Sequence, residues 1–500
     1  MFRFRVKPEL VVFSAAIIAV GAGCSGNRSM LPGVGPQTVA AWRSSHAGGQ
    51  VTRLSSQPPT GMQLEWLLTD GSILAQSGSN WSNFYRYYPD ANGSYADGTW
   101  KQVASLQSGY GPDAAASQVL GNGKFVISGG EYNTPGNGYD LQLTNLGAVY
   151  DPVANTFTPL GHPRHWGWIG DSPSTVAPDG RMIVGQKLTE DDAALDPTTL
   201  KWKTLRHKGK ADFNAEEGWT LLPDGTIMTA DVKAATNSEI YNPTTETWKT
   251  AGSTIVDLHS PSPYGCLMYG KGLCYYPPGE IGPAILRPDG TVFFTGSYSS
   301  GYGPGHTAIY NWKKGTWTAG PDFPNGDNAG DNFGVLEPSG NVLIFGSSGT
   351  AYEWNGTTFS QLNGITEQGP PLLLPTGQIM VLGYSSVILY TPTGSPKAKW
   401  APTIKTYPSS VSAGQTYKIT GTKFTGWGQA EAFGDEYQNS TSYPLVRITN
   451  NASGKVWYAH THDHSTMGIA TGRKTVSTMF DVPSGIASGA STLVVVANGI

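Results

Sequence analysis

A short pattern of two apolar runs joined by a glycine-containing turn occurs seven times in this 500-residue chain. Asp-Gly and Asn-Gly turns are typical of tight hairpins, because these residues adopt positive φ angles. Each copy therefore predicts a β-hairpin with a two-residue turn that ends in glycine. The copies are 64–78, 114–130, 172–186, 218–231, 282–297, 333–347 and 370–383.

Most copies are followed by a second pattern, in which an aromatic or aliphatic strand leads through a turn to a Trp or Phe. "NSEIYNPTTETWKTAG" and "HTAIYNWKKGTWTAG" are examples. Four strands per repeat, at intervals of roughly 40 to 60 residues, are typical of a β-propeller blade. The pattern predicts an all-β, seven-bladed β-propeller over 50–399, with aromatic rings between the blades.

The repeats stop near Trp400, and alternating strands with turn signals occupy 400–500. This pattern predicts an immunoglobulin-like β-sandwich. Residues 1–24 have a basic leader, an apolar run and Cys24, typical of a signal peptide of the lipoprotein type. Ordinary cleavage after Ala22 is the alternative. The Gly-, Ser- and Pro-rich segment 25–49 is interpreted as a linker.

The predicted signal peptide implies that the protein is exported from the cytoplasm. Cys266 and Cys274 lie close in sequence, and an oxidising compartment favours a disulfide between them. A net charge of −4 and the lack of a basic stripe give no reason to expect nucleic acid as a partner. The only membrane contact expected is a lipid on Cys24, so the protein is expected at the cell surface, in the periplasm or secreted. The oligomeric state stays open.

The sequences "GDEYQNSTSYPLVRITN" and "DVPSGIASGASTLVVVANG" resemble the early-set sandwich of the galactose oxidase and glyoxal oxidase family. A kelch-type propeller followed by such a sandwich is similar to that family over about 50–500. The resemblance implies a copper-radical oxidase of primary alcohols or aldehydes. Its copper site would need two tyrosines and two histidines, with one tyrosine crosslinked to a cysteine.

This chain has other residues at the positions that correspond to those ligands. Glu367 and Gln368 occupy the places of an adjacent Tyr-His pair, and Ala114 occupies the place of the cysteine. The second tyrosine falls near Asp171, and the sandwich loop "AFGDEYQNSTSYPL" contains no histidine. We therefore do not expect copper, and expect a non-oxidase relative.

Six of the seven hairpins have an acid seven to nine residues before the turn. Equivalent positions of the inner strands meet around the channel of a propeller, so these acids could ring one mouth of it. One interpretation is a cation site, with calcium as the candidate because it prefers oxygen ligands. The alternative is that each acid caps its own strand and faces water. The residues are Asp113, Asp171, Glu216 or Glu217, Glu280, Asp331 and Glu367.

A second candidate site is "YAHTHDHSTMG", in which His460, His462 and His464 would point to one side of a strand. That spacing suits a zinc or copper site, although three such rings converge on one metal only where the strand bends. Polar contact with the propeller is the alternative.

These features predict a surface-binding protein whose ligand is carbohydrate or another component of the cell envelope. The alternative is an enzyme, either the copper-radical oxidase or a hydrolase or lyase that uses the carboxylates with a metal.

Overall fold

We describe the fold from a computed structural model of the chain, within residues 44–46, 49–133, 142–232, 236–259, 267–269, 273–275, 281–297, 304–383, 386–429 and 436–500. Two short 3₁₀ turns, η1 (Pro324–Gly326) and η2 (Ala398–Trp400), interrupt an otherwise all-β chain in these ranges. No helix there is long and apolar enough to cross a membrane.

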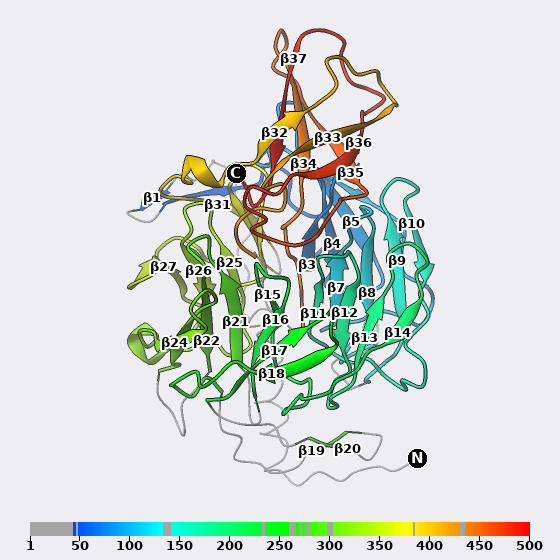
Figure 1. Cartoon of the computed structure of the whole chain (residues 1–500). Helices are drawn as coiled ribbons and strands as arrows, with labels where there is room; N and C mark the ends of the chain where they lie inside the picture. The colour runs from blue at the N-terminus through cyan, green and yellow to red at the C-terminus, as the bar shows by residue number, and fades with distance from the viewer. Residues whose placement is uncertain are drawn as a thin grey trace.

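Seven antiparallel sheets form the blades of a propeller, as predicted (Figure 1). Blades 1 to 4 contain β3 (Met62–Leu67), β4 (Ile73–Ser77), β5 (Phe84–Tyr88), β6 (Thr99–Gln102); β7 (Ala116–Val119), β8 (Phe125–Ser128), β9 (Gly147–Asp151), β10 (Thr156–Pro159); β11 (Ser174–Val176), β12 (Met182–Gly185), β13 (Asp192–Leu195), β14 (Trp202–Thr204); and β15 (Thr220–Leu221), β16 (Ile227–Ala230), β17 (Ser238–Asn242), β18 (Thr247–Thr250).

Blades 5 to 7 contain β21 (Ile281–Leu286), β22 (Thr291–Gly296), β23 (Thr307–Asn311), β24 (Thr316–Ala319); β25 (Gly334–Leu336), β26 (Val342–Phe345), β27 (Ala351–Trp354), β28 (Phe359–Leu362); and β29 (Pro371–Leu373), β30 (Ile379–Leu382), β31 (Val387–Pro392), with β1 (Ser44–His46) and β2 (Gly49–Arg53). A two-stranded ribbon, β19 (Leu267–Tyr269) and β20 (Leu273–Tyr275), lies between blades 4 and 5 in sequence.

The last blade is completed by the first described strands of the chain. Strand β2 pairs antiparallel with β31, from Gly49 opposite Pro392 to Arg53 opposite Ile388. Blade 7 therefore joins both ends of the propeller sequence in one sheet. This pairing closes the ring through backbone hydrogen bonds between the first and last segments of the propeller.

The seven hairpins form as predicted, but their turns differ from the predicted two-residue type. In the first, the Gly71 N–H donates to Leu68 O and the Leu68 N–H donates to Ser72 O. The loop is therefore three residues long and ends in a left-handed glycine, the geometry of a turn followed by a bulge. Gly71 has a φ of 75°, whereas the residue before it is not left-handed, so only the glycine needs a positive φ.

Aromatic side chains pack between neighbouring blades, as predicted. The rings of Trp66 in blade 1 and Phe125 in blade 2 have centroids 4.5 Å apart. Phe293 in blade 5 stacks on Trp354 in blade 6, with centroids 3.7 Å apart and planes 8° apart. Radially arranged blades diverge outward, and such large rings fill the widening space between them.

The C-terminal domain contains β32 (Thr403–Thr406), β33 (Thr416–Thr422), β34 (Leu445–Asn450), β35 (Val456–His462), β36 (Val476–Asp481) and β37 (Ser491–Val496). Strand β35 pairs with β34 along its first half and with β36 along its second half. It thereby links the two layers of a β-sandwich around a core that includes Ile419, Val446 and Phe480.

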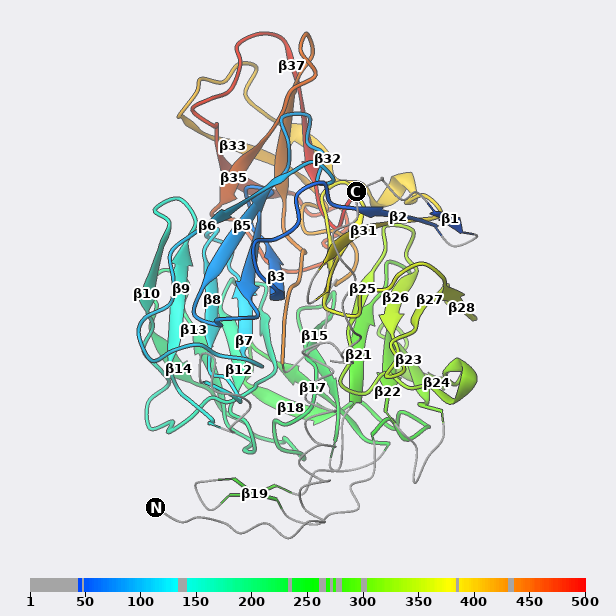
Figure 2. The ribbon, with the colours of Figure 1, turned by 180° about the vertical axis from the view of Figure 1, so that it is seen from behind.

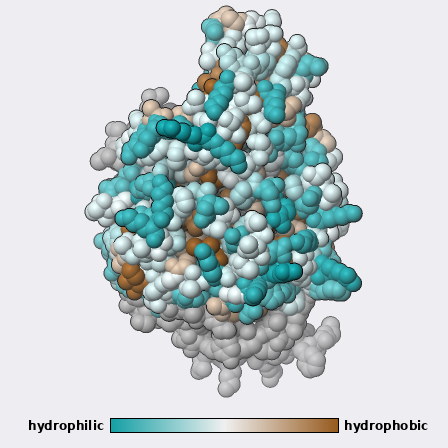
Figure 3. Space-filling view, in the orientation of Figure 1, coloured by the Kyte–Doolittle hydropathy of each residue, from teal (hydrophilic) through white to brown (hydrophobic). Residues whose placement is uncertain are grey.

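The sandwich lies against one end of the propeller (Figures 1 and 2). Its β35 segment contacts the hairpin turns of blades 1 and 2, where the Thr461 N–H donates to Thr69 O and the His464 N–H donates to Gly121 O. Both views show an orange segment before β34 descending among the inner strands. We call its described part, 436–443, the channel loop. The face of the molecule in Figure 3 is mostly polar, with apolar residues in small separate areas.

Candidate functional site

The predicted acids lie at the ends of the inner strands that face away from the sandwich. At the other ends of the inner strands, the hairpin turns of blades 1 and 2 contact the β35 segment. The acids in the described ranges are all buried, with exposures between 0% and 9%: Asp113, Asp171, Glu216, Glu217, Asp331 and Glu367. This burial contradicts the interpretation in which each acid faces water. Glu280 lies outside the described residues.

A buried lysine joins two of these acids. Lys187 Nζ lies 2.5 Å from Asp171 Oδ2 and 2.6 Å from Glu216 Oε1, and the three side chains are exposed by 0%, 1% and 7%. Lys187 lies two residues after the end of β12, and continuing the register of β11 and β12 brings it opposite Asp171. Antiparallel pairing within blade 3 therefore places the Lys187 ammonium beside the Asp171 carboxylate.

Two further acids, which the sequence did not identify as site residues, complete the group. Glu131 follows β8, and Glu436 lies in the channel loop. One carboxylate oxygen from each of Glu131, Asp171 and Glu436 lies within 4.8 Å of the other two. We call these three residues the oxygen triad. The Asp171 carboxylate has one buried oxygen, Oδ1, without a hydrogen-bond partner, whereas its Oδ2 accepts a hydrogen bond from Lys187.

The triad, Glu216 and Asp331 form what we call the central acidic cluster. Burial raises the pKa of Asp171 to about 7, against the lowering effect of Lys187. Burial also raises the pKa of Glu436 to about 8. Burial and the neighbouring acids raise the pKa values of Glu131 and Asp331 well above their usual range. Among the described residues, Lys187 contacts two of these five carboxyl groups. The raised pKa values favour retained protons or an added cation at neutral pH.

The backbone at two members of the cluster is left-handed. Glu216 has a φ of 54° and Asp331 a φ of 58°, and they lie four and three residues before the inner strands of their blades. Ala114 occupies the corresponding place in blade 2 with a φ of 49°. Non-glycine residues adopt this conformation at a cost, and such residues concentrate at functional sites.

The channel loop is held firmly among the inner strands. The Gln438 side chain is fully buried, and its Oε1 accepts hydrogen bonds from the Ser117 N–H at 2.8 Å and from Ser174 Oγ at 2.7 Å. The Ala115 N–H donates to Glu436 O at 2.9 Å. Blades 2 and 3 therefore fix the position from which Glu436 reaches the cluster.

The remaining predicted acids have separate partners. Asp113 accepts hydrogen bonds at Oδ1 from Gln63 Nε2 and from the Ala114 N–H. Glu367 accepts hydrogen bonds from Thr366 Oγ1 at 2.8 Å and Ser386 Oγ at 2.5 Å. Neither belongs to the oxygen triad, so the structure contains a one-sided cluster in place of an even ring.

Glu216 belongs to the central acidic cluster, whereas the neighbouring Glu217 points away from it. The Glu217 carboxylate lies 3.1 Å from Lys210 Nζ and accepts a hydrogen bond from Trp219 Nε1 at 2.9 Å. Lys210 Nζ also lies 4.2 Å from the centroid of Trp248. This sealed group has the character of a structural ion pair inside blade 4.

The three predicted histidines do not act together. His460 and His462 both face Asp481 of β36, whereas the Nδ1 of His464 lies 2.8 Å from Thr478 Oγ1. Strand β35 ends at His462, and Asp463 has a φ of 50°. The chain leaves the strand there, so the alternation that would align His464 is lost. Burial lowers the pKa of His464 to about 3.

The donor set does not fit a copper-radical centre. Asp171 and Glu367 carry carboxylates, Gln368 an amide and Ala114 a methyl group. None of these four supplies the phenolate, imidazole or thiolate that the resemblance requires. Cys24 and Cys266 lie outside the described residues, and Cys274 lies in β20 opposite Met268. The disulfide therefore stays a prediction.

Comparison with solved structures supports the fold. A copper-containing fungal alcohol oxidase of the AA5 family matches with a TM-score of 0.51 and 13% identity, covering 87% of this chain and 99% of the oxidase. A streptogramin B lyase matches with a TM-score of 0.45 and 11% identity, covering 70% of this chain and all of the lyase. No protein-family model and no curated protein matches the sequence. The chain thus shares the propeller fold of a galactose-oxidase-like alcohol oxidase, and the comparisons show no more than that fold.

Proposed function

We propose that this protein is an exported, non-oxidase relative of galactose oxidase that binds a ligand through a divalent cation in the central acidic cluster. The observation that carries the proposal is the oxygen triad, in which three carboxylates approach within 4.8 Å and Asp171 Oδ1 is buried without a partner. A cation would satisfy this oxygen and offset the mutual repulsion of the acids.

Calcium is the first candidate for the cation. Ca²⁺ binds oxygen ligands at about 2.3–2.6 Å, so ligands on opposite sides of the ion are separated by about 5 Å. The separation within the triad falls inside that limit. Lys187 supplies one positive charge already, and a second cation is compatible with it because five carboxyl groups surround the site.

Carbohydrate or another polyhydroxylated component of the cell envelope is the proposed ligand. Calcium commonly keeps coordination positions for oxygen atoms that the protein does not supply, and sugar hydroxyls can fill them. The predicted signal peptide and lipid attachment at Cys24 would bring the protein to the envelope where such ligands occur.

The test is calcium binding to purified mature protein, measured by isothermal titration calorimetry and thermal unfolding with Ca²⁺, Mg²⁺ or EDTA. Glu436→Gln should lose most of the calcium response, because it removes one charged ligand of the triad. The matched control is Glu367→Gln, which alters a buried acid before the inner strand of blade 7 that lies outside the triad. Binding to an array of envelope polysaccharides should then require calcium.

Failure of calcium to bind, or equal binding by the two variants, would contradict the cation site. Calcium binding without any calcium-dependent binding of a polysaccharide would contradict the ligand class only.

A hydrolase or lyase is the second candidate function. It is favoured by the pKa of Asp171, raised by burial to about 7 beside Lys187, and by the pKa of Glu436, raised to about 8. Such acids could exchange protons at neutral pH. Release of reducing ends or unsaturated products from an envelope polysaccharide, lost in Asp171→Asn, would favour this function over simple binding.

A further inference from the structure

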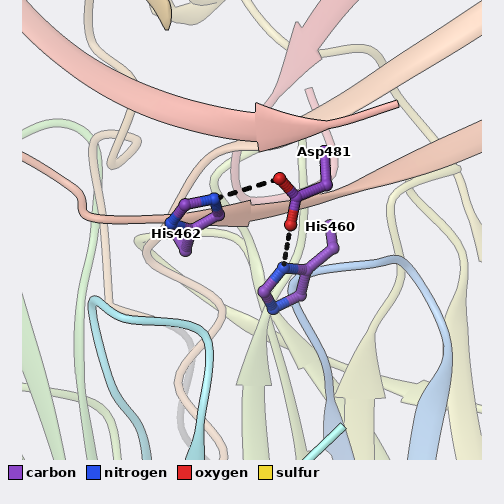
Figure 4. Close-up of side chains that lie close together, drawn as sticks. All are labelled: His460, His462 and Asp481. Carbon is purple, nitrogen blue, oxygen red and sulfur yellow. Dashed lines mark hydrogen bonds and ion pairs between the residues drawn. The ribbon is translucent and has the colours of Figure 1, made fainter. Parts of the chain in front are cut away.

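Two histidines and an aspartate meet on one face of the sandwich, away from the central acidic cluster (Figure 4). His460 and His462 are two residues apart in β35, so both project from the same side of the strand. Asp481 lies directly opposite His460 in the neighbouring strand β36. Local strand pairing alone therefore holds these three side chains together.

The distances between these groups suit ligands of one metal ion. His460 Nδ1 lies 3.3 Å from Asp481 Oδ2, and His462 Nε2 lies 3.3 Å from Asp481 Oδ1. Both contacts are longer than the 2.7–2.9 Å of a charge-assisted hydrogen bond. Tetrahedral ligands about 2.0–2.1 Å from Zn²⁺ are separated from one another by about 3.3 Å. One ligand atom from each residue lies within 4.8 Å of the others.

The second nitrogen of His462 supports the same interpretation. Its Nδ1 lies 2.9 Å from Asp463 Oδ2. When the Nδ1–H donates to that carboxylate, the Nε2 of the neutral ring carries a lone pair that faces the Asp481 carboxylate. Two acceptors in contact repel each other unless a proton or a metal ion lies between them. A carboxylate behind a ligating histidine is the usual arrangement at protein metal sites.

The surroundings leave space for an ion on one side and hold the ligands on the other. The side chains of His462 and Asp481 are exposed by 21% and 39%, so the site is open to solvent. Thr416 Oγ1 donates a hydrogen bond to Asp481 Oδ1. His460 Nε2 is buried against the hairpin turn of blade 2, where a Cβ added to Gly123 would lie 2.4 Å from it.

We propose that His460, His462 and Asp481 bind a zinc-class divalent transition-metal ion, with water in the remaining coordination position. Nitrogen and carboxylate ligands together favour Zn²⁺, Cu²⁺ or Ni²⁺ over calcium. Because His460 also packs against blade 2, the ion would stabilise the contact between the sandwich and the propeller. His464 is not among the ligands, since the group whose ligand atoms lie within 4.8 Å of one another is His460, His462 and Asp481.

The experiment is a zinc titration of chelator-treated mature protein by calorimetry and by competition with a chromophoric zinc indicator. We expect one equivalent of Zn²⁺ with micromolar or tighter affinity and a rise in the unfolding temperature. His462→Gln and Asp481→Asn should each weaken binding at least tenfold. Asp463→Asn should weaken it about 10- to 100-fold, as expected for a carboxylate that orients a ligating histidine.

The matched control is His306→Gln, which removes the histidine of an unrelated, solvent-accessible His–Asp pair, with Nδ1 2.6 Å from Asp322 Oδ1. It should leave zinc binding unchanged. Glu436→Gln should also leave zinc binding unchanged, so the zinc site and the proposed calcium site in the central acidic cluster are tested independently. Circular dichroism would establish that each variant is folded, and the wild-type titration does not depend on any variant.

The absence of saturable zinc binding to the wild-type protein would overturn the proposal. Retention of full affinity in both His462→Gln and Asp481→Asn would overturn it as well. In that case the three groups share protons only.

Discussion

Replacing Lys187 by methionine tests whether the central acidic cluster needs positive charge. The side chain is fully buried and pairs with Asp171 and Glu216. Methionine retains an apolar stem of similar length but removes the ammonium. Removing one partner of a buried ion pair costs about 3–5 kcal/mol, because the remaining charge stays buried without compensation.

The loss of stability should be measured by urea or thermal unfolding at neutral pH in EDTA. At about 2 °C per kcal/mol for a large domain, Lys187→Met should lower the unfolding temperature by about 6–10 °C. Calcium should restore much of it, because a ligand at a hundred times its Kd contributes about 2.7 kcal/mol. The variant should also bind calcium more tightly than the wild type.

Lys210→Met is the matched control. Lys210 is equally buried and contacts Glu217 and Glu239, but neither acid belongs to the oxygen triad. It should lose similar stability without recovery in calcium. Two results would refute the reasoning: unchanged stability of Lys187→Met in EDTA, or equal calcium recovery in both lysine variants.

Three further predictions test other parts of the structure. Burial raises the pKa of Asp192 to about 7, so its contribution to stability is fully present below about pH 4 and is lost as pH rises to 7. Asp192→Asn should remove about 3 kcal/mol of the fall in unfolding free energy between pH 4.5 and 7.5, measured by urea unfolding, and an unaltered pH profile would contradict this. Gly123→Ala should destabilise the protein more than Gly109→Ala, because both glycines have a φ near 80° but only Gly123 would place the new Cβ against His460. We expect a difference of about 1–2 kcal/mol in unfolding free energy, and equal losses would show that backbone strain alone matters. Gln438→Ala should cost about 1–3 kcal/mol, because a buried backbone N–H and a buried hydroxyl lose their acceptor; an unchanged unfolding temperature would mean that the channel loop adds no stability.

The blades could be predicted from sequence because hairpins form from neighbouring residues. The turn at Gly71 needs only one left-handed residue between two apolar strands, and both features are readable within a few residues. Even here the turn length was wrong, since the loop has three residues. Strand β2 lies far from β31 in sequence, and its pairing in blade 7 was not predicted.

The candidate sites were only partly predictable. Asp171, Glu216 and Asp331 were found because they occupy equivalent positions in their blades. Lys187 and Glu131 could have been found by continuing the hairpin register past the second strand, which brings them opposite the acids that precede the first strand.

Glu436 illustrates a different limit. Nothing in the local sequence of its loop indicates that the loop passes among the inner strands. The same holds for Asp481, which meets His460 only through the pairing of β35 with β36.

The sequence by itself determined the all-β class and the seven hairpins, because each depends on residue type and short-range spacing. Only the tertiary structure decided which acids share a site. That outcome depends on ring closure by β2, on the opposite turns of Glu216 and Glu217, and on the channel loop that carries Glu436 into the propeller. These are contacts between residues far apart in sequence, and the energy of the whole packed ring selects them.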